Sequence, residues 1–171
     1  MEDKLTGLLR SDVFVEKAIN LMRVISRSDG SNRYISVIVA DMVGLKKINE
    51  SGEGGHAKGD EALKLAAEIF TRAFRVTDLI SRWHDRGDEF IVFLPLTDEE
   101  GGAGLIARLS EELDRKGVSF RFGISSAACP LTKINEKSCR EYLASLAREA
   151  DEKLISQKNI SKKKPRKRSA S

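Results

Sequence analysis

The spacing of apolar residues changes several times along the chain, and each change marks a new secondary-structure element. Apolar residues at helical spacing predict long helices over residues 12–28, 56–73, 97–116 and from residue 138 onward. Continuous or alternating apolar runs predict strands over residues 33–42, 79–83, 89–94 and 118–125, and a short strand is expected ahead of the first helix. This order predicts an α+β fold with a central, mostly antiparallel sheet flanked by helices.

Polar residues at the predicted helix starts suggest how three of the helices begin. Ser11 is expected to cap the first helix with its hydroxyl group. Thr97, with Glu100 three residues later, has the form of a capping box, and Ser138 with Glu141 repeats it. The sequence therefore predicts a hydroxyl cap on each of these helices.

Carboxylates lie at the ends of two predicted strands. Asp41 closes the strand over residues 33–42, whereas Asp88 and Glu89 follow Gly87 at the start of the strand over residues 89–94. Neighbouring strand residues point to opposite faces, so Asp88 and Glu89 are expected to have different tasks. If the two strands lie side by side, Asp41 and Asp88 converge on one ion, and hard cations such as Mg²⁺ prefer oxygen ligands. An acidic turn alone is more often a plain turn, but two such sites favour metal-assisted phosphoryl transfer.

The segment Arg86-Gly87-Asp88-Glu89-Phe90 resembles the motif that gives the GGDEF domains, the diguanylate cyclases, their name. Arg86 replaces the first glycine, and His84-Asp85 is inserted before it. Further motifs of the family occur in the expected order at residues 3–8, 41–49 and 55–60 and at Ala150-Asp151. The resemblance implies a palm-like nucleotide cyclase fold, with the GGDEF-type domain over residues 1–160. The basic residues that follow predict a disordered tail over residues 161–171.

This resemblance also implies a reaction, in which two GTP molecules condense into cyclic di-GMP with release of pyrophosphate. Each domain would hold one GTP, so a homodimer is expected, with Mg²⁺ or Mn²⁺ as the cofactor. Asp41, Asp88 and the backbone carbonyl of Met42 are the implied metal ligands. The implied catalytic residues are Asp88, Glu89 and Lys46.

The family's substrate-binding residues also have counterparts here. Asn49 and Asp60 match the residues that read the guanine base. The implied phosphate contacts are Lys46, Lys158 and Lys162, and Gly87 lies where the backbone approaches the nucleotide. Lys162 stands in the place of an arginine and offers a point charge rather than a planar fork.

Arg75 and Asp78 match an Arg-x-x-Asp element that precedes the signature hairpin of the family. In relatives that keep this element it forms an allosteric site, where the product cyclic di-GMP binds and inhibits. A guanidinium suits that role because it contacts phosphate through two parallel hydrogen bonds. The bare pattern also arises by chance, so both interpretations stay open.

The alternative function is a degenerate GGDEF domain that binds GTP or cyclic di-GMP as a signalling module without turnover. Both carboxylate sites and both guanine-reading residues favour the enzyme. The Arg86 substitution, the inserted residues and the altered segment Leu9-Arg10-Ser11 favour the binding module. Val43 and Gly44 replace a usual acidic and a usual aromatic residue of the family, which implies less support for the ion than is usual. Arg86 either crowds the nucleotide or supplies one more phosphate contact.

The net charge of +4 is concentrated at one end of the 171-residue chain. The last eleven residues hold six of the 30 basic residues and no acid, which leaves 24 basic against 26 acidic residues in the rest. Such a tail can bind nucleic acid or an anionic membrane, but no aromatic residue interleaves with its charges to stack on bases. A solubilising tail is therefore the favoured interpretation, and nucleic-acid binding is not expected.

Composition also bears on the compartment. No apolar run approaches the roughly 20 residues that cross a bilayer, and the N-terminus shows no signal-peptide pattern. Cys129 and Cys139 have no metal-site spacing and are expected to be reduced thiols. These features predict a cytoplasmic protein.

Overall fold

A four-stranded antiparallel sheet forms the centre of the molecule, in the order β2-β3-β1-β4. The computed structural model describes residues 1–28, 30–52, 54–85, 87–130 and 134–163. The strands are β1 (Tyr34–Met42), β2 (Leu79–Arg82), β3 (Glu89–Pro95) and β4 (Phe120–Ala128). The helices are α1 (Ser11–Ile25), α2 (Leu45–Asn49), α3 (Gly55–Ala73), α4 (Glu99–Arg115) and α5 (Glu136–Lys163).

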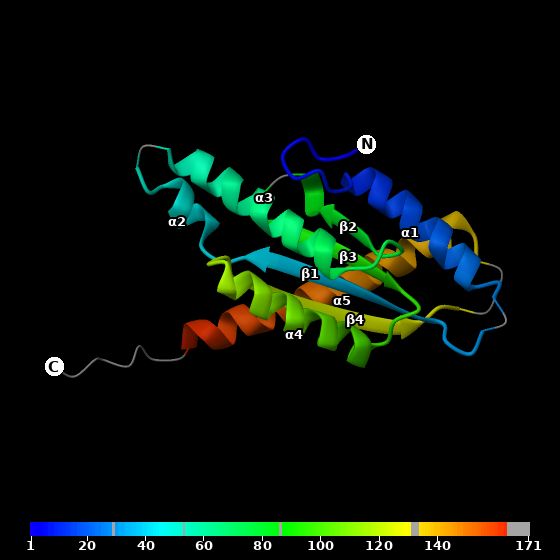
Figure 1. Cartoon of the computed structure of the whole chain (residues 1–171). Helices are drawn as coiled ribbons and strands as arrows, with labels where there is room; N and C mark the ends of the chain where they lie inside the picture. The colour runs from blue at the N-terminus through cyan, green and yellow to red at the C-terminus, as the bar shows by residue number, and fades with distance from the viewer. Residues whose placement is uncertain (29, 53, 86, 131–133, 164–171) are drawn as a thin grey trace.

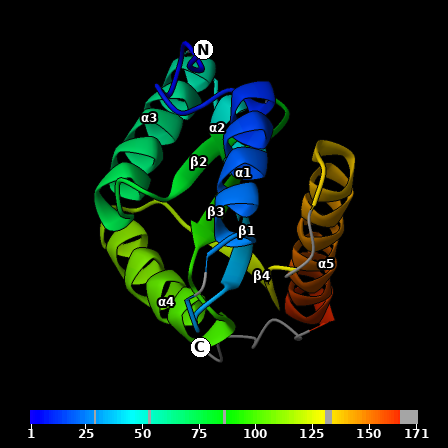
Figure 2. The ribbon, with the colours of Figure 1, turned by 90° about the vertical axis from the view of Figure 1, so that its right-hand side faces the viewer.

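Two pairs of helices enclose the sheet in three layers (Figures 1 and 2). Helices α3 and α4 pack on one face around Phe70, Leu109 and Leu113, and α1 and α5 pack on the other around Phe14, Met22 and Leu146. Strand β1 lies between β3 and β4 and is buried along both faces from Ile35 to Met42. This double coverage explains why its sequence is a continuous apolar run rather than an alternating one.

The predicted α+β architecture is confirmed, but the expected strand ahead of the first helix is not a strand. That segment makes only isolated bridges, from Leu9 to Glu2 and to Ser81. Its backbone groups are used locally, because the Asp3 amide donates to the Leu8 carbonyl and the Gly7 amide donates to the Asp3 carbonyl. The segment before α1 therefore forms a tight turn instead of pairing along a strand.

The three predicted hydroxyl caps are wrong. Helix α1 has Arg10 at its N-cap without a side-chain hydrogen bond, and the Ser11 hydroxyl donates to the Arg82 carbonyl. Helix α4 is capped by Asp98, whose carboxylate accepts from the Gly101 amide at 2.9 Å. Ahead of α5, Asn135 accepts from the Ser138 amide, so Ser138 lies inside the helix rather than at its cap. In the last two cases a neighbouring side chain takes the capping role, the Asp98 carboxylate one residue after Thr97 and the Asn135 amide three residues before Ser138.

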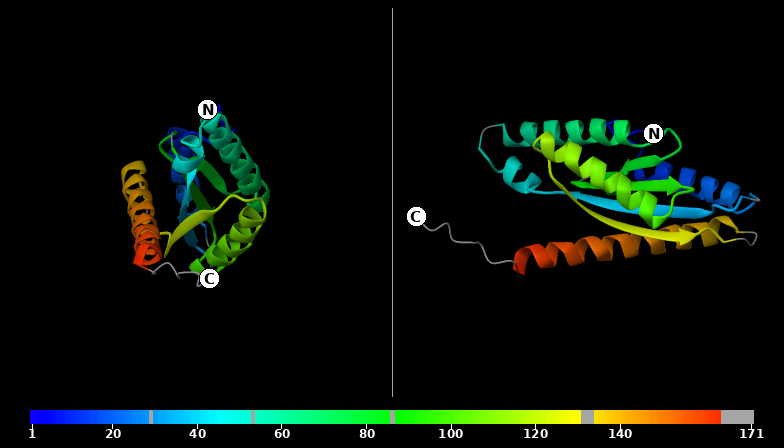
Figure 3. Two further views of the ribbon diagram at one scale, coloured as in Figure 1. Left: turned by 90° about the vertical axis from the view of Figure 1, so that its left-hand side faces the viewer. Right: turned by 60° about the horizontal axis from the view of Figure 1, so that its bottom comes forward.

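Helix α5 runs along the sheet and ends at Lys163 (Figure 3). The side chain of Lys162 and most of the basic tail lie outside the described residues, and so does Arg86. Cys129 and Cys139 are buried free thiols, as expected. None of the described helices is both long and apolar enough to span a bilayer.

Candidate functional site

The candidate site lies where β1 ends and β3 and β4 begin. Asp41 stands directly opposite Glu89 of β3 on one side and Arg121 of β4 on the other. Residues paired in this way project to the same face of a sheet. All three side chains therefore lie on the face that α1 and α5 cover. The two acidic strand ends lie side by side, but the residue directly opposite Asp41 is Glu89 rather than Asp88.

Asp41 is buried and its carboxylate contacts two cations. Its Oδ2 atom lies 3.0 Å from the Lys158 ammonium nitrogen and 3.8 Å from a guanidinium nitrogen of Arg121. Lys158 was expected at a phosphate, and here it contacts the implied metal ligand instead. Arg121 was not among the site residues predicted from the sequence, although its place in an alternating strand could have assigned it to the polar side chains on this face.

A glycine allows helix α5 to reach the site. A Cβ atom at Gly123 would overlap the carbonyl oxygen of Ala150, so only glycine permits the observed contact between β4 and α5. The Ser125 hydroxyl reinforces that contact by donating to the Glu149 carboxylate at 2.8 Å. This close approach brings the C-terminal half of α5, with Lys158, over Asp41.

Asp88 and Glu89 are partly buried, and their surroundings disfavour the ionised form of both carboxyl groups. Burial and the neighbouring charge of Asp41 raise the pKa of Asp88, and the charges of Lys158 and Arg82 partly offset this. Burial, Asp41 and Asp151 raise the pKa of Glu89. The Asp88 carbonyl also accepts from the Met42 amide at 3.0 Å, which fixes Asp88 beside the end of β1. A bound cation would relieve this accumulation of negative charge.

The donor chemistry of this cluster fits a hard divalent cation. Asp41, Asp88 and Glu89 offer carboxylate oxygens, the ligands that Mg²⁺ and Mn²⁺ prefer. Within the part of the chain that the structure describes, no three acidic, His or Cys side chains are already gathered as a ligand set. Since Asp41 is engaged with Lys158 and Arg121, a cation that binds here would compete with these two side chains for the carboxylate.

The residues predicted to read guanine lie on two helices that touch. Asn49 of α2 is half-buried against α3, where a Cβ atom at Gly59 would overlap its side-chain oxygen and one at Gly55 would overlap its carbonyl oxygen. Asp60, the residue after Gly59, is exposed. The two glycines thus set the approach of α2 to α3 and place Asn49 beside the turn that carries Asp60.

Lys46 occupies the solvent side of α2. Its side chain is 86% exposed, and its ammonium nitrogen lies 3.8 Å from the Glu50 carboxylate. An exposed pair of this kind contributes little to stability. The lysine is therefore available to an anionic ligand.

The hairpin that carries Asp88 and Glu89 is held by Arg82. The Arg82 guanidinium donates to the Gly87 carbonyl at 2.9 and 3.1 Å and lies 3.6 Å from the Asp3 carboxylate. Burial alone would raise the pKa of Asp3, but hydrogen bonds from Thr6 and the charge of Arg82 outweigh it and lower the pKa. Arg82 thus ties the N-terminal turn to the hairpin, and Gly87 adopts the positive φ of 79° that favours glycine.

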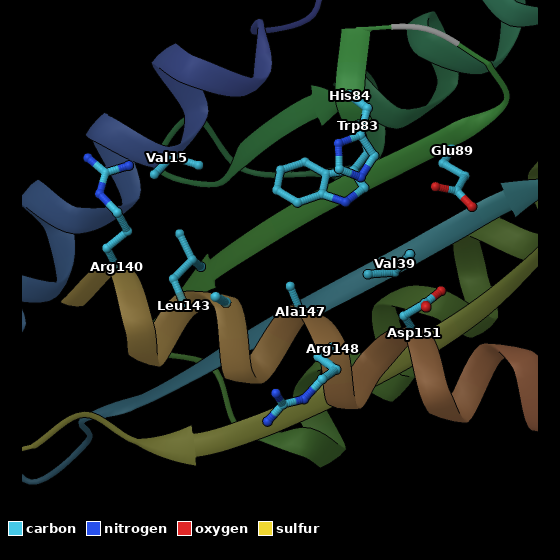
Figure 4. A pocket seen from close by; sticks show the side chains of 11 residues that line it. Val15, Val39, Trp83, His84, Glu89, Arg140, Leu143, Ala147, Arg148 and Asp151 are labelled. Carbon is cyan, nitrogen blue, oxygen red and sulfur yellow. The ribbon is translucent and has the colours of Figure 1, made fainter. Parts of the chain in front are cut away.

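Trp83 and His84 line a 410 Å³ pocket that ends at Glu89 (Figure 4). Its floor is apolar, with Val39 and Ala147, and Asp151 lies at the same end as Glu89. Trp83 packs edge-on against Phe14, with ring centroids 6.0 Å apart, and its ring contacts that of His84. Trp83 and His84 therefore form one wall of a cavity beside the candidate catalytic carboxylate.

Arg75 and Asp78 lie at a separate place, at the start of β2. The Asp78 carboxylate accepts from the Arg75 backbone amide at 2.8 Å, and both residues line a 490 Å³ cavity together with Lys17 of α1. Burial raises the pKa of Asp78, and the hydrogen bond and charge of Arg75 partly offset this. Arg75 and Asp78 thus form a turn beside a cavity that Lys17 also lines.

The sequence of this chain is similar to the sequences of known proteins. The family described as "Diguanylate cyclase, GGDEF domain" matches residues 1–164. Diguanylate cyclase DgcP of Pseudomonas aeruginosa is 33% identical over 129 residues, which are 75% of this chain and 18% of that protein. The cyclic di-GMP phosphodiesterase NbdA of the same organism is 32% identical over 112 residues, 65% of this chain and 13% of that protein.

Solved structures show the same fold. The GGDEF domain of TpbB (YfiN) from Pseudomonas aeruginosa has a TM-score of 0.74 at 23% identity, covering 94% of this chain and 90% of that one. The GGDEF domain of DgcB from Caulobacter crescentus, solved in complex with cyclic di-GMP, has a TM-score of 0.73 at 18% identity, covering 92% and 90%. The chain spans less than a fifth of DgcP and of NbdA.

Proposed function

Because this chain belongs to the GGDEF domain family, we propose that it is a diguanylate cyclase, which condenses two GTP molecules into cyclic di-GMP and pyrophosphate. The observation that supports this most is the meeting of Asp41 and Glu89 across neighbouring strands, with Asp88 hydrogen-bonded beside them. Three carboxyl groups lie together at one end of the sheet, and the pKa values of two of them are raised. This arrangement suits metal-assisted phosphoryl transfer.

In this proposal Asp41, Asp88 and the Met42 carbonyl hold Mg²⁺ or Mn²⁺. The ion would polarise the α-phosphate and favour ionisation of the attacking 3′-hydroxyl group. Glu89 would accept the proton of that hydroxyl, a task for which a raised pKa is an advantage in a general base. Glu89 lines the 410 Å³ pocket, which leaves its carboxyl group accessible to a reacting group.

The remaining predicted residues bind and orient the nucleotide. Asn49 and Asp60 would hydrogen-bond the guanine edge from the contact between α2 and α3, and Gly87 would let the backbone approach the nucleotide. Lys46, Lys158 and Lys162 would neutralise phosphate charge. Each domain holds one nucleotide, so two copies must face each other for each 3′-hydroxyl to reach the other α-phosphate, and a homodimer in the cytoplasm is the proposed working form.

The deciding experiment incubates purified protein with GTP and Mg²⁺ at concentrations that favour dimers and follows cyclic di-GMP by chromatography. The matched control is Asp88→Asn, which keeps the shape and removes the charge. We expect product from the wild type and a loss of about 100-fold or more in the variant, because Lewis-acid catalysis supplies several kcal/mol and about 1.4 kcal/mol is tenfold in rate. Wild-type protein that binds GTP and yields no product would contradict the proposal.

The second candidate is a binding module that holds GTP or cyclic di-GMP without turnover. The contacts of Lys158 and Arg121 with Asp41 favour it, because they neutralise the carboxylate that catalysis needs. The similarity to NbdA, which is named a phosphodiesterase, shows that a related segment occurs in a protein named for another activity. In the same assay this candidate predicts nucleotide binding that is equal in wild type and Asp88→Asn, with no product from either.

Arg75 and Asp78 are proposed to form an allosteric site for the product. Their cavity also contains Lys17, so a phosphate group would meet two positive side chains there. Added cyclic di-GMP should then slow the reaction without competing with GTP.

A further inference from the structure

Two cations share one oxygen atom at the carboxylate that is proposed to hold the metal ion. Lys158 lies 3.0 Å and Arg121 3.8 Å from the same Oδ2 atom of Asp41. Lys158 already has a proposed task at the triphosphate. Arg121 has none, yet it occupies the strand position directly opposite Asp41.

The sheet fixes Arg121 in this place. Its backbone pairs with β1, and two residues later Gly123 holds β4 against α5. The Arg121 side chain is 33% exposed, so its guanidinium can turn between the carboxylate and a ligand in the solvent. Among the described residues, Asp41 is the only ion-pair partner of Arg121.

A divalent ion at Asp41 competes with these cations for the same oxygen. The ion must displace at least one of them or be held beside a like charge, and either event weakens its binding. A triphosphate changes this balance, because it offers the displaced guanidinium anionic oxygens that suit its planar fork. The ion and the nucleotide then favour each other's binding.

From this geometry we infer that Arg121 is a positioning residue that makes divalent-cation binding conditional on the nucleotide. Without nucleotide, Arg121 occupies Asp41 and weakens the metal site. With nucleotide, it turns to the phosphates and releases the carboxylate. The inference rests on the proposed nucleotide site, and it adds a residue and a binding order to it.

The test measures Mn²⁺ binding by electron paramagnetic resonance, with and without a GTP analogue that has a nitrogen between its α- and β-phosphates, the linkage that the proposed reaction breaks. Wild type should bind Mn²⁺ about tenfold more tightly when the analogue is present, a usual size for coupling between two ligands. Arg121→Gln should bind Mn²⁺ several-fold more tightly than wild type without the analogue, and the analogue should improve its binding less.

Three further variants make the result specific. Arg121→Lys keeps the charge and should retain most of the coupling, whereas Arg121→Ala should behave as Arg121→Gln does. Arg72→Gln removes one exposed arginine on α3 and controls for the change in net charge. Thermal unfolding of each variant confirms that the compared proteins are folded.

The outcomes separate this inference from the proposed function. If Arg121→Gln and wild type bind Mn²⁺ equally without nucleotide, the inference is overturned, even when wild type produces cyclic di-GMP. If Arg121→Gln binds Mn²⁺ more tightly and loses the coupling, while wild type makes no product, the inference holds for a binding module and the cyclase proposal fails.

Discussion

The two faces of the sheet differ in what their side chains do. On the α3/α4 face, Phe70 packs against Phe90 and Phe120 with ring centroids 4.9 and 5.4 Å apart, and apolar residues fill the space. On the α1/α5 face, the apolar core gives way near the end of β1 to Asp41, Glu89 and a pocket. One face therefore supplies mainly stability, and the other gives up some apolar packing to place charged groups at the proposed site.

We expect the largest effect from a substitution in the core of the α3/α4 face, which supplies mainly stability. Phe70→Ala should reduce the free energy of unfolding by about 3–5 kcal/mol, because it removes a fully buried ring and leaves a cavity. Denaturant unfolding measures this, with Phe70→Leu as the control that keeps most of the volume. Below the unfolding transition the variant should still bind guanine nucleotide, and a loss of binding in folded protein would show that the two faces are not separate.

A substitution on the face that carries the site should have a smaller effect on stability. Gly123→Ala places a Cβ atom against the Ala150 carbonyl oxygen, and overpacking of this kind costs about 1–3 kcal/mol. Because α5 must shift, Lys158 moves away from Asp41 and nucleotide affinity should fall more than the stability does. Isothermal titration calorimetry and denaturant unfolding measure the two effects.

Gly104→Ala is the matched control for this substitution. Gly104 lies in α4 with nothing near the position of a Cβ atom, so the added methyl group should be neutral or stabilise the helix by up to about 1 kcal/mol. Unchanged nucleotide binding by Gly123→Ala would contradict the role given to the contact between β4 and α5.

The smallest expected effect concerns pH. Burial and neighbouring charge raise the pKa of Glu89 above its usual value of 4.5, so the folded protein holds this proton more tightly than the unfolded chain does. The contribution of Glu89 to stability should therefore fall as the pH rises from below 4.5 through the raised pKa and then level off. Without divalent cations, Glu89→Gln should lose less stability than wild type over that window.

Urea unfolding at a series of pH values measures this difference. Glu111→Gln on the exposed side of α4 is the control and should follow the wild-type curve. Parallel curves for wild type and Glu89→Gln would show that the charge cluster does not oppose the ionisation of Glu89.

Much of the fold could be predicted because apolar periodicity is a local signal. The strand expected over residues 33–42 is Tyr34–Met42, and the one expected over 89–94 is Glu89–Pro95. The helix caps were less predictable, since several neighbouring polar side chains can accept the same amide hydrogen. Asp98 rather than Thr97 caps α4, and Asn135 rather than Ser138 precedes α5.

The sequence by itself determined the family motifs, the order of the elements and the two acidic strand ends. Tertiary structure alone decided which side chains meet there, because strand register pairs residues that are far apart in the chain. Register sets Arg121 beside Asp41, and the close contact at Gly123 brings Lys158 over the same carboxylate. The charge at the end of β1 therefore depends on distances between elements, which no local pattern of residues encodes.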